Sequence, residues 1–508
     1  MAPTQSSQNW ALPLVVLIVG MFMSVLDTTI VNVALPTIQK EFGITLDEVQ
    51  WVATAYTLTL GVVTPASSWL SDKIGARRLY ILCLIGFAIG SALCGFAGNL
   101  NMLVAFRILQ AIAGGILPVV TVSILYMIVP REKIGMAMGM YGLGVVFAPG
   151  VGPTLGGYLV EYVDWRLIFF VNVPIGVLGV FAAVATLPHL PGREAGPFDL
   201  FGFLSIGTCL FTLLLAVTEG PDWGWDSYTI RMLFIASGIS LALFIVVELE
   251  VDNPMLDLRI FRYWPFTNSL LLMAVLSVGL FTVLFYIPQL LQEHQGLGAF
   301  ESGLVLLPEA IALAIMMPIA GRLYDAIGPR WPATIGLAIL AYGTYLLDQI
   351  TLDTPRETIM WLLALRSVGL GLAMMPVMTG GTSAVPPDKV GAASAFNNVV
   401  QRTAGAMGVA GLTALLTSTQ AQTVADRSGL MPAATTALPQ IGPPGTPAFA
   451  AEFATYQQLQ SQSFVSALDE QFVIVAVVTA FGVVLALMMR SGRAPATPAG
   501  EGAASALA

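Results

Sequence analysis

Long apolar runs follow one another along almost the whole chain, separated by short polar segments. A helix of about 20 apolar residues crosses the hydrocarbon core of a bilayer, and we count fourteen runs near that length. They cover residues 11–35, 50–71, 79–98, 102–128, 135–160, 166–187, 200–217, 231–249, 266–290, 302–323, 331–349, 358–379, 392–416 and 470–490. The pattern predicts an all-α integral membrane protein with fourteen transmembrane helices.

A repeated motif divides these helices into two related halves. The motif L-x-D-x-I-G-x-R begins at Leu70 and again at Leu323, 253 residues later. A second echo follows each copy, because P-R-E-K-I-G at 130–135 is matched by P-P-D-K-V-G at 386–391. Each copy lies between two apolar runs, so the repeat marks one structural position in each half.

The seventh and eighth runs have no counterpart in the repeat and are predicted as an inserted helix pair, within a region spanning 191–262. A six-helix bundle is expected on either side, at 1–190 and 263–490, followed by a cytoplasmic tail at 491–508. The segment 418–468 is rich in Ala, Thr, Gln, Pro and Gly. It is predicted as a loosely folded extracytoplasmic loop.

Basic residues provide an independent test of the helix count, because Lys and Arg favour cytoplasmic loops. With fourteen helices and both termini inside, the outer segments hold only Lys40, Arg166, Arg231, Arg356 and Arg427. The inner segments hold Lys73, Arg77, Arg78, Arg131, Lys133, Arg193, Arg259, Arg262, Arg322, Arg330, Lys389, Arg490 and Arg493. The count and the charge bias agree, and we expect a multi-pass protein of the bacterial inner membrane.

Composition supports a bilayer location, since 56% of the residues are hydrophobic and 10% are charged. The net charge of −9 comes mostly from loop acids, so no basic partner is inferred. Cys83, Cys94 and Cys209 lie in apolar runs, and no disulfide or metal framework is expected. No Lys or Arg precedes the first run, and no small-residue cleavage site follows it, so the first helix is expected to be retained.

Four stretches resemble the fourteen-helix drug:proton antiporters, a branch of the major facilitator superfamily. They are L-D-T-T-I-V-N-V-A-L-P at 26–36, S-W-L-S-D-K-I-G-A-R-R at 68–78, R-I-L-Q-A-I-A-G-G from Arg107, and G-P-T-L-G-G at 152–157. The chain departs from that pattern at Ser68, Ala76 and Ala111. The resemblance implies two six-helix bundles plus two inserted helices, and export of amphipathic, often cationic drugs in exchange for protons.

Asp27 lies deep in the first apolar run, where a carboxylate costs about 2.5 to 3.5 kcal/mol and tends to face a partner or a polar cavity. Arg107, in the fourth run, is expected at a similar depth. Competition between burial and a nearby cation lets a conformational change control protonation. Asp27 with Arg107 is therefore the first candidate for proton coupling, and a static structural pair is the alternative.

Glu309 interrupts an otherwise apolar run in the second half, and Arg366 lies at a similar depth in its own run. Glu309 is a candidate for a substrate or proton carboxylate, and equally for a buried member of an ion pair. The loop-edge Asp348 is a third candidate acid. Arg402 carries the same ambiguity as Glu309.

A substrate cavity is predicted between the two bundles. The 21 Met and 26 Phe residues suit an adaptable apolar cavity, although core packing and lipid contact account for most of them. The candidate cavity residues are Asn32, Trp51, Tyr56, Glu309, Asn397 and Gln401, of which Asn397 and Gln401 belong to a polar face beside Arg402.

Two sets of residues are candidates for conformational change. Small residues let helices pack closely, and the resemblance gives Gly152, Pro153, Gly156 and Gly157 the role of sealing the interface between halves in an exchanger. The repeated motifs are predicted to act as cytoplasmic latches. Their residues are Asp72, Gly75, Arg77 and Arg78 in the first copy and Asp325 and Arg330 in the second.

Several functions are disfavoured by the sequence. No nucleotide-binding G-x-x-x-x-G-K-[ST] loop is present, and the only two histidines, His189 and His294, are far apart. We therefore expect no enzyme activity, no cofactor or metal, and no nucleic-acid partner. A proton gradient is the expected energy source, and protons, membrane lipids and a small molecule are the expected partners of a monomer.

The sequence thus predicts a proton-coupled multidrug efflux antiporter that works by alternating access and confers antibiotic resistance. A proton-driven exporter of an endogenous lipid or metabolite shares every motif and stays open. A nutrient symporter is disfavoured, because the first run lacks E-x-x-E-R. A membrane sensor or scaffold would need a signalling domain, and no segment of the sequence indicates one.

Overall fold

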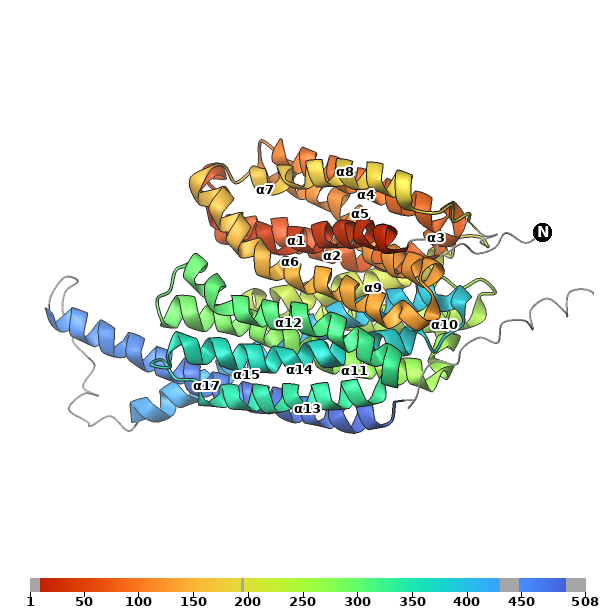
Figure 1. Ribbon diagram of the computed structural model, residues 1–508. Helices are drawn as coiled ribbons and strands as arrows, with labels where there is room; N and C mark the ends of the chain where they lie inside the picture. The colour runs from red at the N-terminus through yellow and green to blue at the C-terminus, as the bar shows by residue number, and fades with distance from the viewer. Residues whose placement is uncertain (1–9, 193–195, 430–446, 490–508) are drawn as a thin grey trace, which may run out of the picture.

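The computed structural model describes residues 10–192, 196–429 and 447–489 (Figure 1). Long helices run roughly parallel to one another, with the N-terminal half along one side and the C-terminal half along the other (Figure 1). All fourteen predicted runs lie in helices. The fold class predicted from the sequence, an all-α membrane protein with the major facilitator architecture, is confirmed.

The N-terminal half consists of α1 to α8. Their bounds are α1 Ala11–Phe42, α2 Leu46–Val63, α3 Ser67–Ile74, α4 Ala76–Gly95, α5 Leu100–Ile128, α6 Ile134–Tyr162, α7 Leu167–Phe170 and α8 Asn172–Thr186. A single turn, η1 (Thr64–Ala66), joins α2 to α3, so that these three elements together form the second crossing.

The C-terminal half repeats this arrangement from α11 to α17. Its helices are α11 Trp264–Gln289, α12 Ala299–Ile327, α13 Arg330–Leu346, α14 Arg356–Thr382, α15 Val390–Gly429 and α17 Pro447–Leu487. Twelve helices in the described part of the chain are long and apolar enough to cross a bilayer. The other two crossings are the segmented α2 and the 17-residue α13.

The inserted pair is formed by α9 (Leu200–Trp223) and α10 (Tyr228–Glu250). α9 packs against α2 and α15, which belong to opposite halves, and α10 packs mainly on α9. The pair therefore covers one seam between the halves.

Local sequence explains several helix starts and ends. At the start of α2, Thr45 and Glu48 form a reciprocal capping box. Asn99 accepts a 2.9 Å hydrogen bond from the Met102 N–H at the start of α5. Gly75 and Gly328, which end α3 and α12, have φ of 91° and 84°. The tight turns predicted at both glycines are therefore present.

The predicted loop at 418–468 is wrong for its described parts. α15 continues to Gly429 and α17 begins at Pro447, while residues 430–446 lie outside the described chain. The predicted helix ends were placed where the hydropathy falls. Ala- and Gln-rich sequence also forms helices readily outside the bilayer, so both helices continue past those points. Both helices project beyond the ends of their neighbours (Figure 1). The predicted tail at 491–508 also lies outside the described residues.

Contact between the halves is made chiefly by α6 and α12, with a second seam where α15 meets α3, α5 and α9. Small residues permit the close approach of α6 and α12. A Cβ added at Gly139 of α6 would lie 2.5 Å from the Met317 carbonyl oxygen of α12. The central pocket lies between these seams.

Candidate functional site

A buried ion pair between Asp27 of α1 and Arg107 of α5 lies inside the N-terminal half. The side chains are 0% and 1% exposed. The second carboxylate oxygen of Asp27, Oδ1, accepts hydrogen bonds of 2.9 Å from Gln110 and 3.0 Å from Asn172. Both of these amides also donate to Ser91 Oγ of α4. Four helices thus enclose one satisfied carboxylate.

Arg107 is held on several sides as well as by Asp27. Its Nη1 donates to Gln110 Oε1 at 2.9 Å, and its Nε donates to the Val52 carbonyl oxygen at 3.3 Å. The guanidinium lies 3.8 Å from the centre of the Tyr56 ring, a cation–π geometry. Removal of either charge would leave the other buried without its partner, at a cost of about 3 to 5 kcal/mol.

A second, more open ion pair occupies the C-terminal half. Arg366 of α14 donates to Glu309 Oε1 of α12 at 3.2 Å and to Thr344 Oγ1 at 3.3 Å, and it also donates to the Gly279 carbonyl oxygen. Arg366 is fully buried, whereas Glu309 is 13% exposed. The structure shows Glu309 as a member of an ion pair, which is one of the two roles predicted for it.

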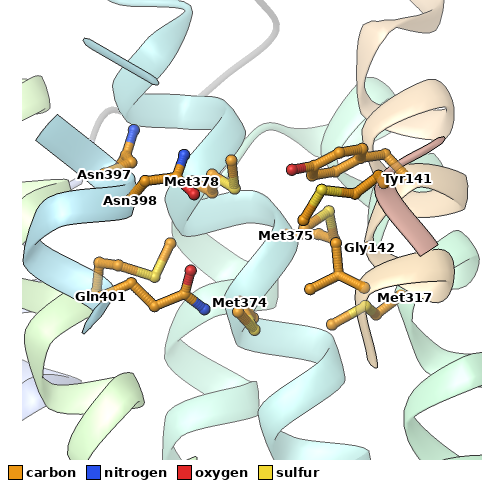
Figure 2. A pocket seen from close by; sticks show the side chains of 12 residues that line it. Tyr141, Gly142, Met317, Met374, Met375, Met378, Asn397, Asn398 and Gln401 are labelled. Carbon is orange, nitrogen blue, oxygen red and sulfur yellow. The ribbon is translucent and has the colours of Figure 1, made fainter. Parts of the chain in front are cut away.

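A small pocket lies between the halves (Figure 2). Helices α1, α6, α11, α12, α14 and α15 line it. Six methionines form most of the apolar wall, and Asn397, Asn398 and Gln401 of α15 form a polar wall that Figure 2 shows opposite Tyr141. The methionines are Met21, Met273, Met317, Met374, Met375 and Met378. Flexible, polarisable thioethers adapt to ligands of different shape.

Two of the six predicted cavity residues line the pocket, and the other four lie elsewhere in the structure. Asn397 and Gln401 line the pocket. Tyr56 instead lies under Arg107, and Trp51 packs beside a cluster of Leu58 with two leucines of α9. Asn32 has an exposed side chain on α1, and Glu309 pairs with Arg366.

The glycines assigned to the interface between halves do not pack there. A Cβ at Gly152 would collide with Thr29 Oγ1, and one at Gly156 would lie 2.9 Å from Ile30 Cγ1, both on α1 of the same half. Gly157 has nothing within 4 Å of such a Cβ, and the side chain of Pro153 lies outside the described residues. The expected interface contact is corrected to a contact with α1, because Gly135, Gly139 and Gly142 occupy the face of α6 that meets α12.

The second copy of the repeated motif joins the two halves directly. Asp325, near the end of α12, accepts hydrogen bonds from the backbone N–H groups of Gly135 at 2.8 Å and Met136 at 2.9 Å, at the start of α6. Unpaired N–H groups and the helix dipole make that helix start attractive to a carboxylate. Arg330, two residues after Gly328, has its guanidinium 5.7 Å from the Trp331 ring centre.

The first copy lies in the corresponding place beside α15. A Cβ at Gly391, at the start of α15, would lie 2.7 Å from Ser68 Oγ of α3. Arg77 donates to the Val184 carbonyl oxygen at 2.6 Å, within its own half, and Arg78 is exposed. Asp72 is part-buried on α3. Asp325 of the second copy therefore contacts the echo at 130–135, and Ser68, two residues before the first copy, lies against the echo at 386–391, each in the opposite half.

Sequence reasoning missed three groups of residues. Gln110, Asn172 and Ser91, which complete the Asp27 cluster, are single polar residues in apolar runs, and this was the only signal available. Tyr141 and the six methionines of the pocket had no distinguishing pattern. The N–H groups of Gly135 and Met136 donate to Asp325 at the end of the 130–135 echo. The recurrence of that echo at 386–391 was a signal that Gly135 and Gly391 have the same role.

A helical protein of two related bundles around one central pocket has the architecture of a membrane transporter. The chain belongs to the Major Facilitator Superfamily, whose family model matches residues 17–409. It is therefore a multi-pass membrane transporter and not an enzyme. The resemblance predicted from the four sequence stretches is confirmed at the level of this family and of its drug-resistance members.

Known proteins similar to this chain agree with that assignment. The MFS-type transporter YhcA of Bacillus subtilis (strain 168) is 36% identical over 405 residues, which cover 80% of this chain and 76% of YhcA. The lincomycin resistance protein LmrB of Listeria monocytogenes serovar 1/2a is 30% identical over 77% of this chain and 83% of LmrB. The proton:xylose symporter XylE has the same fold, with a TM-score of 0.63, 11% identity, and coverage of 96% of this chain and 97% of XylE.

Proposed function

We propose that this transporter is a proton-coupled efflux antiporter that exports amphipathic compounds, often cationic in the family it resembles, by alternating access. The observation that carries the proposal is the fully enclosed Asp27–Arg107 pair. The pair lies inside the N-terminal half, separate from the pocket between the halves. In this proposal the proton binds at the pair and the substrate binds in the pocket, and movement of the N-terminal half affects both sites.

The position of α6 supports coupling between these two places. Tyr141 and Gly142 of α6 line the pocket, while Gly152 and Gly156 of the same helix pack against Thr29 and Ile30, two and three residues after Asp27. A change in the tilt of α6 on substrate binding therefore acts on the segment of α1 that carries Asp27. In this proposal Gly152 and Gly156 act by keeping α6 and α1 in close contact.

The Asp325 end of the bundle is closed by contacts between the halves, including a 3.2 Å hydrogen bond from Tyr126 of α5 to the Thr379 carbonyl oxygen of α14. We assign this end to the cytoplasm, with both termini on that side of a bacterial inner membrane, in line with the distribution of basic residues. Opening of this end would admit substrate from the cytoplasm, with the proton gradient as the energy source and no cofactor. Relatives named for lincomycin and multidrug resistance support drugs as the cargo.

Substrate-triggered proton release from acid-loaded inside-out vesicles tests the proposal. We expect release in the wild type and in Glu309→Gln, and loss of release in Asp27→Asn. Asp27→Glu is the matched variant, since it keeps the charge and is expected to retain part of the release.

Each variant must first elute from size exclusion as folded protein, so that loss of release reports on coupling. Absence of release for every compound in a panel of drugs and native extracts would reject drug:proton antiport. Full release in Asp27→Asn with loss in Glu309→Gln would move proton coupling to the C-terminal half.

A further inference from the structure

Three arginines lie well away from the ends of membrane-spanning helices, and among the described residues two of the three have carboxylate partners. Arg107 pairs with Asp27 and Arg366 pairs with Glu309. Arg402, in the middle of α15, forms no ion pair with any of the described residues. A guanidinium at this depth is costly without a partner and marks a substrate or ion pathway.

Arg402 lies beside the pocket on the polar face of α15. Asn398 lines the pocket, and Arg402 follows it by four residues, so the two lie on the same face of the helix. The titratable groups near Arg402 are the phenols of Tyr56 and Tyr141, which are neutral hydroxyls of the N-terminal half, and Tyr141 also lines the pocket. The cation therefore faces the gap between the halves.

An unpaired polar atom in the pocket is the second, independent observation. Asn397 is 2% exposed, and its Oδ1 has no hydrogen-bond partner. Its Nδ2 donates to Thr382 Oγ1 at 3.2 Å, and that hydroxyl donates to the Met378 carbonyl oxygen at 2.9 Å. Because the Thr382 proton is already used, the orientation of the Asn397 amide is fixed. A buried acceptor remains, and it calls for a donor from a ligand.

We propose that the pocket selects amphipathic organic anions, with Arg402 binding the acidic group, Asn397 Oδ1 accepting a hydrogen bond from a ligand hydroxyl, and the methionines enclosing the apolar body. This inference rests on the proposed function, because it names the substrate class of the same transport path. It differs from the cationic cargo that the family resemblance implies. Among the described residues that line the pocket none is an Asp or Glu, so no lining carboxylate offsets the charge of the neighbouring Arg402, and an anion is favoured over a cation.

Two dyes with the same ring system and opposite charge test this selectivity. At a pH below the pKa of its phenol, fluorescein is a monoanion with a carboxylate and a phenolic hydroxyl, whereas rhodamine 123 is a cation whose carboxyl group is a methyl ester; both dyes are measured at that pH. Binding of each dye to the purified full-length protein in detergent is measured by fluorescence anisotropy. The variants are Arg402→Gln, Arg402→Lys and Asn397→Ala, and Arg356→Gln at an exposed position of α14 is the matched control.

We expect the wild type and Arg356→Gln to bind fluorescein more tightly than rhodamine 123. Arg402→Gln should weaken fluorescein binding by at least roughly tenfold, because a charge-assisted contact is lost, and should leave rhodamine 123 binding unchanged or tighter. Arg402→Lys should retain part of the preference. Asn397→Ala should weaken fluorescein binding without reversing the charge preference.

Three results would overturn the proposal: tighter binding of rhodamine 123 by the wild type, equal weakening of both dyes in Arg402→Gln, or no fluorescein binding by folded wild type. If Arg402→Gln does not fold, Arg402→Lys and Asn397→Ala carry the same comparison. Anion selectivity that depends on Arg402, without proton release for any substrate, would reject antiport and leave this site standing. Proton release triggered only by cations would do the reverse.

Discussion

The carboxylate of Asp325, from the C-terminal half, accepts a 2.8 Å hydrogen bond from the backbone N–H of Gly135, from the N-terminal half. The Met136 N–H donates to the same carboxylate. A repeated acidic motif is thus bound to the start of a helix in the other half, and this contact must break before the Asp325 end can open.

Removal of this contact is expected to shift the protein toward a form open at the Asp325 end. Asp325→Ala deletes two charge-assisted hydrogen bonds, together worth about 2 to 3 kcal/mol, so the ratio of closed to open forms should fall by roughly thirtyfold or more. Nitroxide labels at Glu132→Cys and Ile327→Cys, both exposed, report the separation of the halves by electron–electron double resonance. The three native cysteines are buried.

The control for this measurement is Asp353→Ala, since Asp353 is an exposed loop acid of the same charge. We expect the label distance to lengthen in Asp325→Ala and to stay unchanged in Asp353→Ala. An unchanged distance in both variants would show that Asp325 does not hold the halves together.

The Asp27–Arg107 pair should show strong energetic coupling. Asp27→Asn and Arg107→Gln each leave one buried group without its partner, at a cost of about 3 to 5 kcal/mol. The double variant removes both charges, so its loss of stability should be smaller than the sum of the two single losses. Thermal unfolding of the purified variants measures this, and additive losses would argue against a direct pair.

Close packing of α6 on α12 should make Gly139→Ala destabilising. The new Cβ would lie 2.5 Å from the Met317 carbonyl oxygen, so the two helices must move apart. Gly238→Ala in α10 is the matched control, since its Cβ meets nothing within 4 Å and Ala is the better helix former by about 1 kcal/mol. The apparent Tm should fall for Gly139→Ala and hold or rise for Gly238→Ala; a fall of equal size in both would contradict this packing.

The ion pair of Lys389 and Asp257, 2.5 Å apart, should make stability depend on pH. Burial raises the pKa of Asp257, but the hydrogen bond and charge of Lys389 outweigh it and hold the pKa below its ordinary value of 3.8. A carboxyl whose pKa is lowered by folding contributes stability above its unfolded pKa and loses that contribution as the pH falls through the folded value.

The wild type should therefore exceed Asp257→Asn in Tm by a constant margin from about pH 8 to pH 5, and the margin should shrink progressively as the pH falls below about 4. The expected difference is about 0.5 to 1 kcal/mol, typical of a partly exposed pair. Thermal unfolding at several pH values gives the comparison. A margin that persists at pH 3 would mean that the aspartate acts through packing and not through charge.

The sequence was sufficient for the helices, because crossing a bilayer imposes length and hydropathy on each segment separately. It was also sufficient for the Asp27–Arg107 pair, since a carboxylate and a guanidinium at the same depth of one bundle have few other partners. Both results follow from the cost of burying charge, which is visible in a one-dimensional pattern.

The partners of Asp325 and the residues that line the pocket could be identified only from the three-dimensional structure. The backbone N–H groups of Gly135 and Met136 have no side-chain signature. The methionines of the pocket cannot be told from those that face lipid, because both kinds lie in uniformly apolar runs. The glycines at 152 and 156 were placed on the wrong neighbour for a related reason, since small residues show that a helix packs closely without showing which helix it meets.

The lengths of α15 and α17 have a mechanical consequence. α17 has 41 residues, or about 60 Å at 1.5 Å per residue, about twice the thickness of the hydrocarbon core. One continuous helix therefore runs along the C-terminal half, from beside the start of α11, and continues beyond that half at its Pro447 end (Figure 1). A rotation of that half by about 10° displaces a helix end 30 Å away by about 5 Å. The projecting end therefore moves farther than the helix segments close to the rotation axis.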